Sequence, residues 1–145
     1  MTIRTRIGFT CLFVCIVSLV ACSQSSSKID KNNDVIAKGY KISNLHKFEK
    51  FALNVGNGEA DKIRIVHYTD EGDPIFQTLE YDGKEVRYTS DDSHDKFAGT
   101  GKGIYSDTCK KITKDIHEED ERYMLTDCKK ETGRNGYDLL SVPVK

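Results

Sequence analysis

The sequence predicts an α+β fold in which a single N-terminal helix packs on an antiparallel sheet of five or six strands. Three observations support it: a helical apolar pattern over residues 43–58, an alternating hairpin pattern on both sides of Asp82-Gly83, and two later strands around an acidic turn at residues 117–120. One helix followed by a series of hairpins is typical of a sheet that carries a helix on one face.

The first 21 residues are predicted to be a secretory signal, since the basic opening MTIRTRIG is followed by the apolar run FTCLFVCIVSLVA. This run is shorter than the ~20 residues that a membrane-spanning helix needs. Its end, Leu19-Val20-Ala21-Cys22, resembles the lipobox of bacterial lipoproteins. The resemblance implies cleavage before Cys22 and a lipid on its sulfur, which would hold the protein on the extracytoplasmic face of the cell membrane. The alternatives are an ordinary signal peptide with an incidental cysteine and an uncleaved anchor.

The chain is therefore expected to comprise a signal at residues 1–21, the lipid attachment and a flexible tether at 22–40, and one globular domain at 41–145. The stretch SQSSSKIDKNND is polar and serine-rich, which is typical of a tether. Without the signal, the chain keeps 20 Lys and Arg against 23 Asp and Glu. A duplex-binding domain would carry a clustered basic excess, so we expect no nucleic-acid partner.

The helix is predicted from the stretch SNLHKFEKFALNVGNG, in which apolar residues recur at helical spacing and share one face. These residues are Leu45, Phe48, Phe51, Ala52 and Val55. Ser43 is the expected N-cap, and Gly56 and Gly58 are residues at which a helix readily ends. We interpret the two phenylalanines as core residues rather than as parts of a ligand site.

The next strand is predicted over KIRIVHY, with Ile63 and Ile65 on one face and Val66 and Tyr68 on the other. The acidic turn TDEGDP follows it. The clearest unit is then the hairpin PIFQTLEYDGKEVRYTS, because an Asp-Gly pair between two alternating runs favours a two-residue turn.

That turn fixes a register, which pairs Tyr81 with Lys84, Leu79 with Val86, and Gln77 with Tyr88. Apolar residues then share one face that we assign to the core, and they are Ile75, Leu79, Val86 and Tyr88. The opposite face is polar apart from Phe76, so we expect it to meet water.

After a long loop, DDSHDKFAGTGKG, the segments GIYSDTCKKITKDI and ERYMLTDC predict two strands joined by the turn HEED. Cys109 and Cys128 are equidistant from the centre of that turn, so they would face each other in a simple hairpin. An exported domain with two remaining cysteines usually pairs them, and we expect a disulfide here. GRNG predicts another turn, and YDLLSVPV a last strand that Pro143 ends or places at an edge.

The block from KISNLHKFEKF to RYTSDDSHDKF resembles a family of small lipoproteins from Bacillus and its relatives that is catalogued as a domain of unknown function. The likeness runs from about Lys41 to Cys128, includes both cysteines of the domain, and is most specific in EGDPIFQTLEYDG. It implies a location in the Gram-positive cell envelope. It implies nothing about activity, so no catalytic residue is carried over.

A metal site is one chemical hypothesis for the long loop. Carboxylates and an imidazole that could bind zinc or calcium fall within five residues, and they are Asp91, Asp92, His94 and Asp95. The stretch lacks the spacing of a calcium loop, so a solvated loop is the simpler interpretation. We expect no bound cofactor.

Acid–base catalysis is a second hypothesis. Asp70, Glu71 and Asp73 lie in a turn that is predicted to be exposed, and His67 lies near its start. The sequence contains no nucleophile elbow, zinc-protease motif or phosphate-binding glycine loop. An envelope hydrolase would have to draw on His67, Asp70, Asp92 and His94.

These observations favour a lipid-anchored binding or interaction module with a protein partner of unknown identity. Exposed aromatic residues near the long loop, such as Phe97 and Tyr105, are the expected contacts. The alternative is a small-ligand or metal-binding envelope protein that uses residues 91–95.

Overall fold

The structure, a computed structural model, describes residues 28–130 and 136–144. The expected signal, the lipobox and Cys22 lie outside the described residues, as does most of the GRNG turn. Within the described part of the chain, no helix has the length and apolar character needed to cross a membrane.

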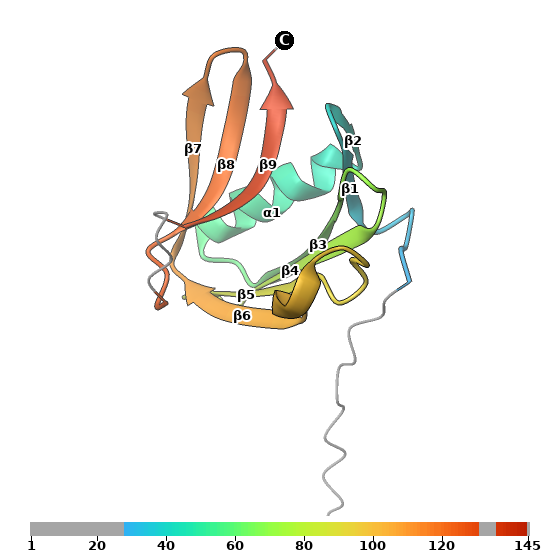
Figure 1. The fold of residues 1–145 in the computed structure, drawn as a ribbon. Coiled ribbons are helices and arrows are strands. Elements are labelled where there is room, and N and C mark those ends of the chain that lie inside the picture. The colour runs from blue at the N-terminus through green and yellow to red at the C-terminus, as the bar shows by residue number, and fades with distance from the viewer. Residues whose placement is uncertain (1–27, 131–135, 145) are drawn as a thin grey trace, which may run out of the picture.

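The described residues form one α-helix and two sheets (Figure 1). The helix α1 spans Leu45–Asn57, and a short 3₁₀ turn spans Gly99–Gly101. The strands are β1 Val35–Lys38, β2 Lys41–Ser43, β3 Asp61–Tyr68, β4 Pro74–Tyr81, β5 Val86–Asp91, β6 Ile104–Cys109, β7 Lys111–His117, β8 Asp120–Thr126 and β9 Tyr137–Pro143. One sheet has the order β2-β1-β3-β4-β5-β6 and the other β7-β8-β9. The α+β class is confirmed, although the strands divide into two sheets and β1 runs parallel to β3.

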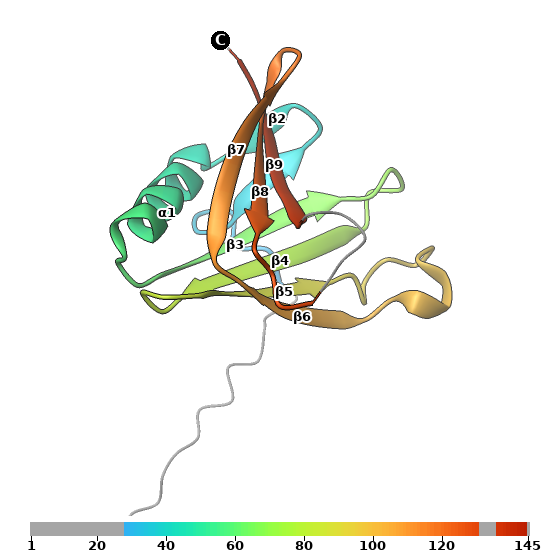
Figure 2. The ribbon, with the colours of Figure 1, turned by 90° about the vertical axis from the view of Figure 1, so that its left-hand side faces the viewer.

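The helix and the three-stranded sheet both lie on one face of the six-stranded sheet, which we call the inner face (Figures 1 and 2). The opposite side of that sheet is the outer face. Phe48 and Phe51 of α1 are fully buried, as predicted, and the ring of Phe48 packs edge-on against Tyr123 of β8 at 5.0 Å. A single core therefore joins the helix to both sheets.

The helix begins one residue later than predicted. Its N-cap is Asn44 and not Ser43, and Asn44 adopts a left-handed backbone conformation with φ of 59°. Its side-chain amide donates to the carbonyls of Lys31 and Asp34, which ties the helix start to the segment before β1. The helix ends at Gly58, whose φ of 75° suits glycine.

Strands β1 and β2 have no counterpart in the sequence prediction. Residues 35–38 fall in the predicted tether, but Val35 is fully buried and pairs with Ile65 of β3. The folded part of the chain therefore begins before residue 41.

The hairpin between β4 and β5 has a different register from the predicted one. Tyr81 pairs with Val86 and Leu79 pairs with Tyr88, so the loop has four residues. The carboxylate of Asp82 accepts hydrogen bonds from the backbone N–H groups of Lys84 and Glu85, and this side-chain turn lengthens the loop. Because the shift is two residues, each side chain stays on its predicted face.

The outer face is not uniformly exposed to water, contrary to the prediction for Phe76. Only 1% of Phe76 is exposed, and its cross-strand neighbour Val66 is fully buried. The guanidinium of Arg64 lies 5.2 Å from the Phe76 ring centroid, and the ring of His94 lies 6.0 Å away. Arg64 and the β5–β6 loop therefore cover this aromatic ring.

The strand predicted over residues 103–116 is interrupted at Lys110, which separates β6 in one sheet from β7 in the other. The predicted pairing about the turn is correct, since His117 pairs with Asp120 and Lys111 with Thr126. Cys109 and Cys128 form the expected disulfide, at the point where the two sheets diverge. Strand β9 lies at an edge and ends at Pro143, as predicted.

Candidate functional site

A cleft of about 670 Å³ lies between the two sheets, where the inner face of β3 and β4 extends beyond the core. The three-stranded sheet forms its other wall. The lining residues that carry polar side chains come from four strands, and they are His67, Tyr68, Gln77, Arg122, Asp138 and Ser141. A volume of this size suits a small organic ligand.

Gln77 is the centre of the hydrogen bonds in this cleft. Its amide nitrogen donates to the backbone carbonyl of Asp138 at 3.1 Å and contacts the Tyr88 hydroxyl at 3.2 Å. Its amide oxygen is therefore turned toward Nε2 of His67, 3.1 Å away. Gln77 thus links the floor of the cleft on β3 and β4 to its wall on β9.

His67 is neutral at neutral pH. Burial lowers its pKa below the ordinary value of 6.5, and this effect outweighs the opposing hydrogen bonds to Gln77 and to the backbone of Leu139. Because the Gln77 oxygen can only accept, the contact between Gln77 and His67 is a hydrogen bond in the tautomer that carries its proton on Nε2.

The lowered pKa of His67 predicts a loss of stability in mild acid. The unfolded chain takes up a proton at His67 near pH 6.5, before the folded chain does. The contribution of His67 is therefore complete above pH 6.5 and declines as the pH falls toward the folded-state pKa. Urea denaturation at pH 7.5 and pH 5.5 should show a smaller acid-induced loss for His67→Gln than for the wild type.

Three other histidines, His46, His94 and His117, remain in that variant and serve as its internal control. An equal loss in His67→Gln and in the wild type would contradict the prediction, because it would assign the pH dependence to other groups.

Two side chains of opposite charge reach the cleft from neighbouring strands of the three-stranded sheet. Arg122 of β8 and Asp138 of β9 both line it and are both exposed. Within the described residues, neither forms an ion pair with the other or with any other group. The cleft therefore offers a cationic and an anionic group to a ligand at the same time.

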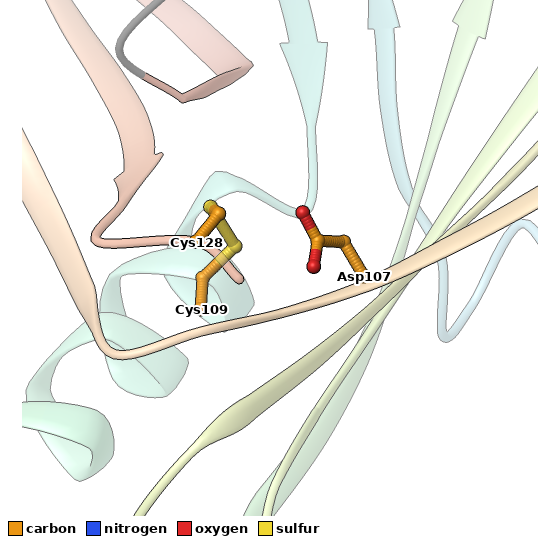
Figure 3. Close-up of side chains that lie close together, drawn as sticks. All are labelled: Asp107, Cys109 and Cys128. Atoms are coloured by element: carbon orange, nitrogen blue, oxygen red, sulfur yellow. A yellow bond between two sulfur atoms is a disulfide. The ribbon is translucent and has the colours of Figure 1, made fainter. Parts of the chain in front are cut away.

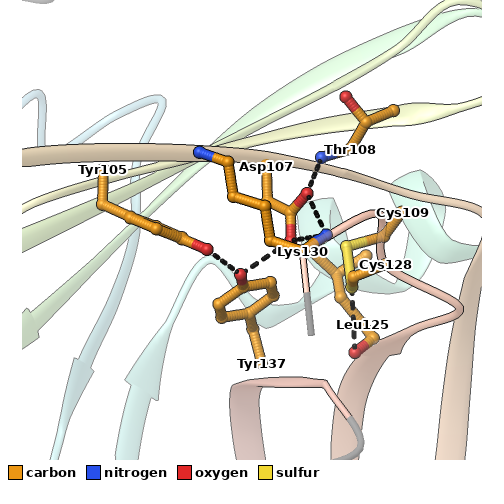
Figure 4. Close-up of a disulfide and its surroundings, with 8 residues drawn as sticks. All are labelled: Tyr105, Asp107, Thr108, Cys109, Leu125, Cys128, Lys130 and Tyr137. Carbon is orange, nitrogen blue, oxygen red and sulfur yellow. Dashed lines mark hydrogen bonds between the residues drawn. A yellow bond between two sulfur atoms is a disulfide. The ribbon is translucent and has the colours of Figure 1, made fainter. Parts of the chain in front are cut away.

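A tyrosine–aspartate network borders the cleft (Figure 4). The Tyr137 hydroxyl donates to Asp107 at 2.7 Å and lies 2.6 Å from the Tyr105 hydroxyl, while its ring stacks on Tyr88 at 4.4 Å. Burial and then the hydrogen bonds to Tyr105 and Asp107 raise the pKa of Tyr137. The network fixes the start of β9 against β5 and β6, and so positions the wall of the cleft.

Asp107 is a buried carboxylate that accepts several hydrogen bonds. Burial raises its pKa, but donors on Tyr137, Thr108 and Lys130 outweigh burial, so the net shift is downward. Together with Cys109 and Cys128 it forms the one cluster of potential metal-ligand atoms in residues 28–130 and 136–144 (Figure 3). Both sulfurs of that cluster are joined in the disulfide, so we do not interpret it as a metal site.

The four residues of the metal hypothesis each have a structural contact in the β5–β6 loop. Asp91 accepts from Ser93, Asp92 accepts from the Gly103 N–H, and Asp95 accepts from the Phe97 N–H. The ring of His94 packs against Phe76. These contacts shape the loop, and metal binding there stays a prediction.

The residues of the hydrolase hypothesis are not brought together. His67 lies on the inner face, and His94 packs on the outer face. Asp70 is exposed in the β3–β4 turn.

The sequence pattern did not identify Gln77, Arg122 or Asp138 as cleft residues. Gln77 does carry a signal, since it is the polar member of an apolar face between Ile75 and Leu79.

One protein family, Domain of unknown function (DUF4362), matches residues 32–124. No curated protein and no solved structure matches the chain.

Proposed function

The chain belongs to the family described as Domain of unknown function (DUF4362), and for this member we propose a lipid-anchored extracytoplasmic binding module whose ligand site is the cleft between the two sheets. The lipid anchor is supported by the resemblance of Leu19-Val20-Ala21-Cys22 to a lipobox and by the signal pattern before it. The ligand site is supported by the geometry of the cleft.

The observation that carries the ligand proposal is the pair of opposite charges at Arg122 and Asp138. A ligand with a single charge would form an ion pair with one of these two side chains. The other side chain carries the same sign as the ligand and would repel it. A small zwitterion, such as an amino acid or a short peptide, would place its carboxylate near Arg122 and its ammonium near Asp138. The neutral imidazole of His67 and the fixed amide of Gln77 would then contribute shape and polarity without adding charge.

The test is a calorimetric titration of the protein with mixtures of amino acids and short peptides, followed by single compounds from any positive mixture. Arg122→Gln and Asp138→Asn should each weaken binding at least about tenfold, since each removes one charge-assisted contact. Arg87→Gln on the outer face and Asp115→Asn, the cross-strand neighbour of Arg122 that does not line the cleft, are matched controls.

Equal binding by Arg122→Gln, Asp138→Asn and the controls would contradict the proposal, because it would mean that the ligand binds outside the cleft. If the wild type bound no small zwitterion, the small-ligand proposal would fail. The expected protein partner would then be sought by crosslinking in intact cells.

A further inference from the structure

The β5–β6 loop, taken together with Ile104 at the start of β6, presents two large apolar side chains to solvent. Phe97 is 71% exposed and Ile104 is 68% exposed, and neither belongs to the cleft or to the core. We propose that this loop inserts into the interfacial layer of the membrane to which the protein is anchored, an inference that rests on the lipid anchor of the proposed function. Insertion of the loop would then fix the orientation of the cleft relative to the membrane.

The acidic residues of the loop do not oppose insertion as strongly as their number suggests. Asp91, Asp92 and Asp95 each accept a backbone N–H from the loop itself. Asp73 of the neighbouring turn accepts the Lys96 N–H and pairs with its ammonium at 3.3 Å. The carboxylates therefore hold the loop in shape, while Phe97 projects from it.

The loop lies on the same face as the start of the described chain. Arg64 donates to the backbone carbonyl of Lys28 at 2.8 Å and stacks over Phe76, whose ring in turn contacts His94 of the loop. In Figure 1, the start of the coloured chain and the loop both lie on the lower side of the molecule, opposite the tips of β7 and β8 and the C-terminal end.

The chain between the expected lipid and the folded domain is short. Cys22 precedes Lys28 by six positions, which span at most about 20 Å when fully extended. A folded domain of this size has a diameter larger than that reach. A lipid on Cys22 would therefore keep the outer face, and with it the loop, close to the bilayer.

Insertion should depend on apolar contact more than on lipid charge. Lys96 and Lys102 belong to the loop, but Asp70 and Glu71 are exposed in the adjacent β3–β4 turn. The electrostatic attraction to anionic lipid is therefore partly cancelled. Phe97 and Ile104 would contribute through burial of their side chains in the interface.

The chain contains no tryptophan, so Phe97→Trp places a single fluorescent reporter on the loop. The lipidated protein, purified from membranes and checked by mass spectrometry, is reconstituted into phosphatidylcholine vesicles with and without phosphatidylglycerol. We expect blue-shifted emission and, with brominated acyl chains, quenching at least about twofold stronger than for the matched control Leu53→Trp. Leu53 is 63% exposed on α1, away from the loop.

The two ways in which the proposal can fail are distinguishable. A protein without lipid mass, or one that does not float with the vesicles, would overturn the anchor and the loop proposal together. A lipidated protein that floats while the Phe97→Trp and Leu53→Trp variants show the same unquenched emission would overturn the loop proposal alone. Blue-shifted emission of the Phe97→Trp reporter in native membranes but not in pure lipid vesicles would also overturn the loop proposal. It would mean that a protein partner, and not lipid, shields the loop from water.

Discussion

Replacing Asp34 with alanine is expected to destabilise the protein by about 3 kcal/mol, because it leaves a largely desolvated guanidinium without its carboxylate. Asp34 forms two hydrogen bonds with Arg64, from Nε to Oδ1 at 2.9 Å and from a terminal nitrogen to Oδ2 at 2.7 Å. The side chains are only 16% exposed for Arg64 and 5% exposed for Asp34. The measurement is urea denaturation of the purified variant beside the wild type.

The size of this effect depends on desolvation rather than on the presence of an ion pair as such. Surface pairs such as Arg87 with Glu80 contribute little, since water screens them. The guanidinium of Arg64 lies instead over the Phe76 ring and against the segment at residues 28–34. Removing its partner leaves a charge that water reaches poorly.

A double substitution separates the cost of leaving the Arg64 charge without its partner from the contribution of the ion pair itself. Arg64→Met combined with Asp34→Ala removes both charges and keeps apolar cover over Phe76, so it should be less destabilising than Asp34→Ala alone. Glu80→Ala is the control for loss of an exposed carboxylate. A loss below about 1 kcal/mol for Asp34→Ala would contradict the prediction, because it would show that Arg64 is solvated in the variant.

Local patterns were sufficient to predict the helix and the disulfide. The spacing of Phe48 and Phe51 is a property of the helix alone, and both residues are buried where predicted. The symmetry of Cys109 and Cys128 about one turn depends only on a regular antiparallel register, which the structure contains. Both inferences used information from short stretches of chain.

The features that could not be predicted depend on contacts between distant residues. Strand β1 has four residues and is stabilised by parallel pairing with β3, a contact that its own sequence does not reveal. The break at Lys110 is not visible in the sequence. Strands β6 and β7 follow one another directly and have the same alternation of side chains, although they belong to different sheets. The cleft combines His67, Gln77, Arg122 and Asp138 from four strands, and only the angle between the sheets brings them together.

The register of the β4–β5 hairpin is an intermediate case. The Asp-Gly pair correctly placed the turn, but Asp82 uses its carboxylate to bond the backbone N–H groups of Lys84 and Glu85. The competition between a two-residue turn and this side-chain turn is decided by small energies that composition does not resolve. The faces were nevertheless assigned correctly, because they depend only on alternation.

Reduction of the disulfide is expected to destabilise the protein by about 3 kcal/mol, since Cys109 and Cys128 close a ring with a sequence separation of 19. The junction between the two sheets should persist without the bond. Lys110 still donates its backbone N–H to the Thr126 carbonyl at 3.2 Å, and Lys129 donates to the Thr108 carbonyl at 2.9 Å. In the chain-entropy model, the loss of stability on reduction therefore arises mainly because the unfolded chain gains conformational freedom.

Urea denaturation of the wild type with and without reductant measures this effect without changing a side chain. The double variant Cys109→Ala with Cys128→Ala should lose more than the reduced wild type, because Cys109 is fully buried and its sulfur leaves a cavity. The denaturant slope should also rise on reduction, since an unfolded chain without the cross-link exposes more surface. An unchanged midpoint and slope would contradict the argument, because they would mean that the junction remains closed even in the denatured chain. Ligand titration of the reduced protein then asks whether the angle between the sheets, and with it the cleft, depends on the bond or on the backbone contacts alone.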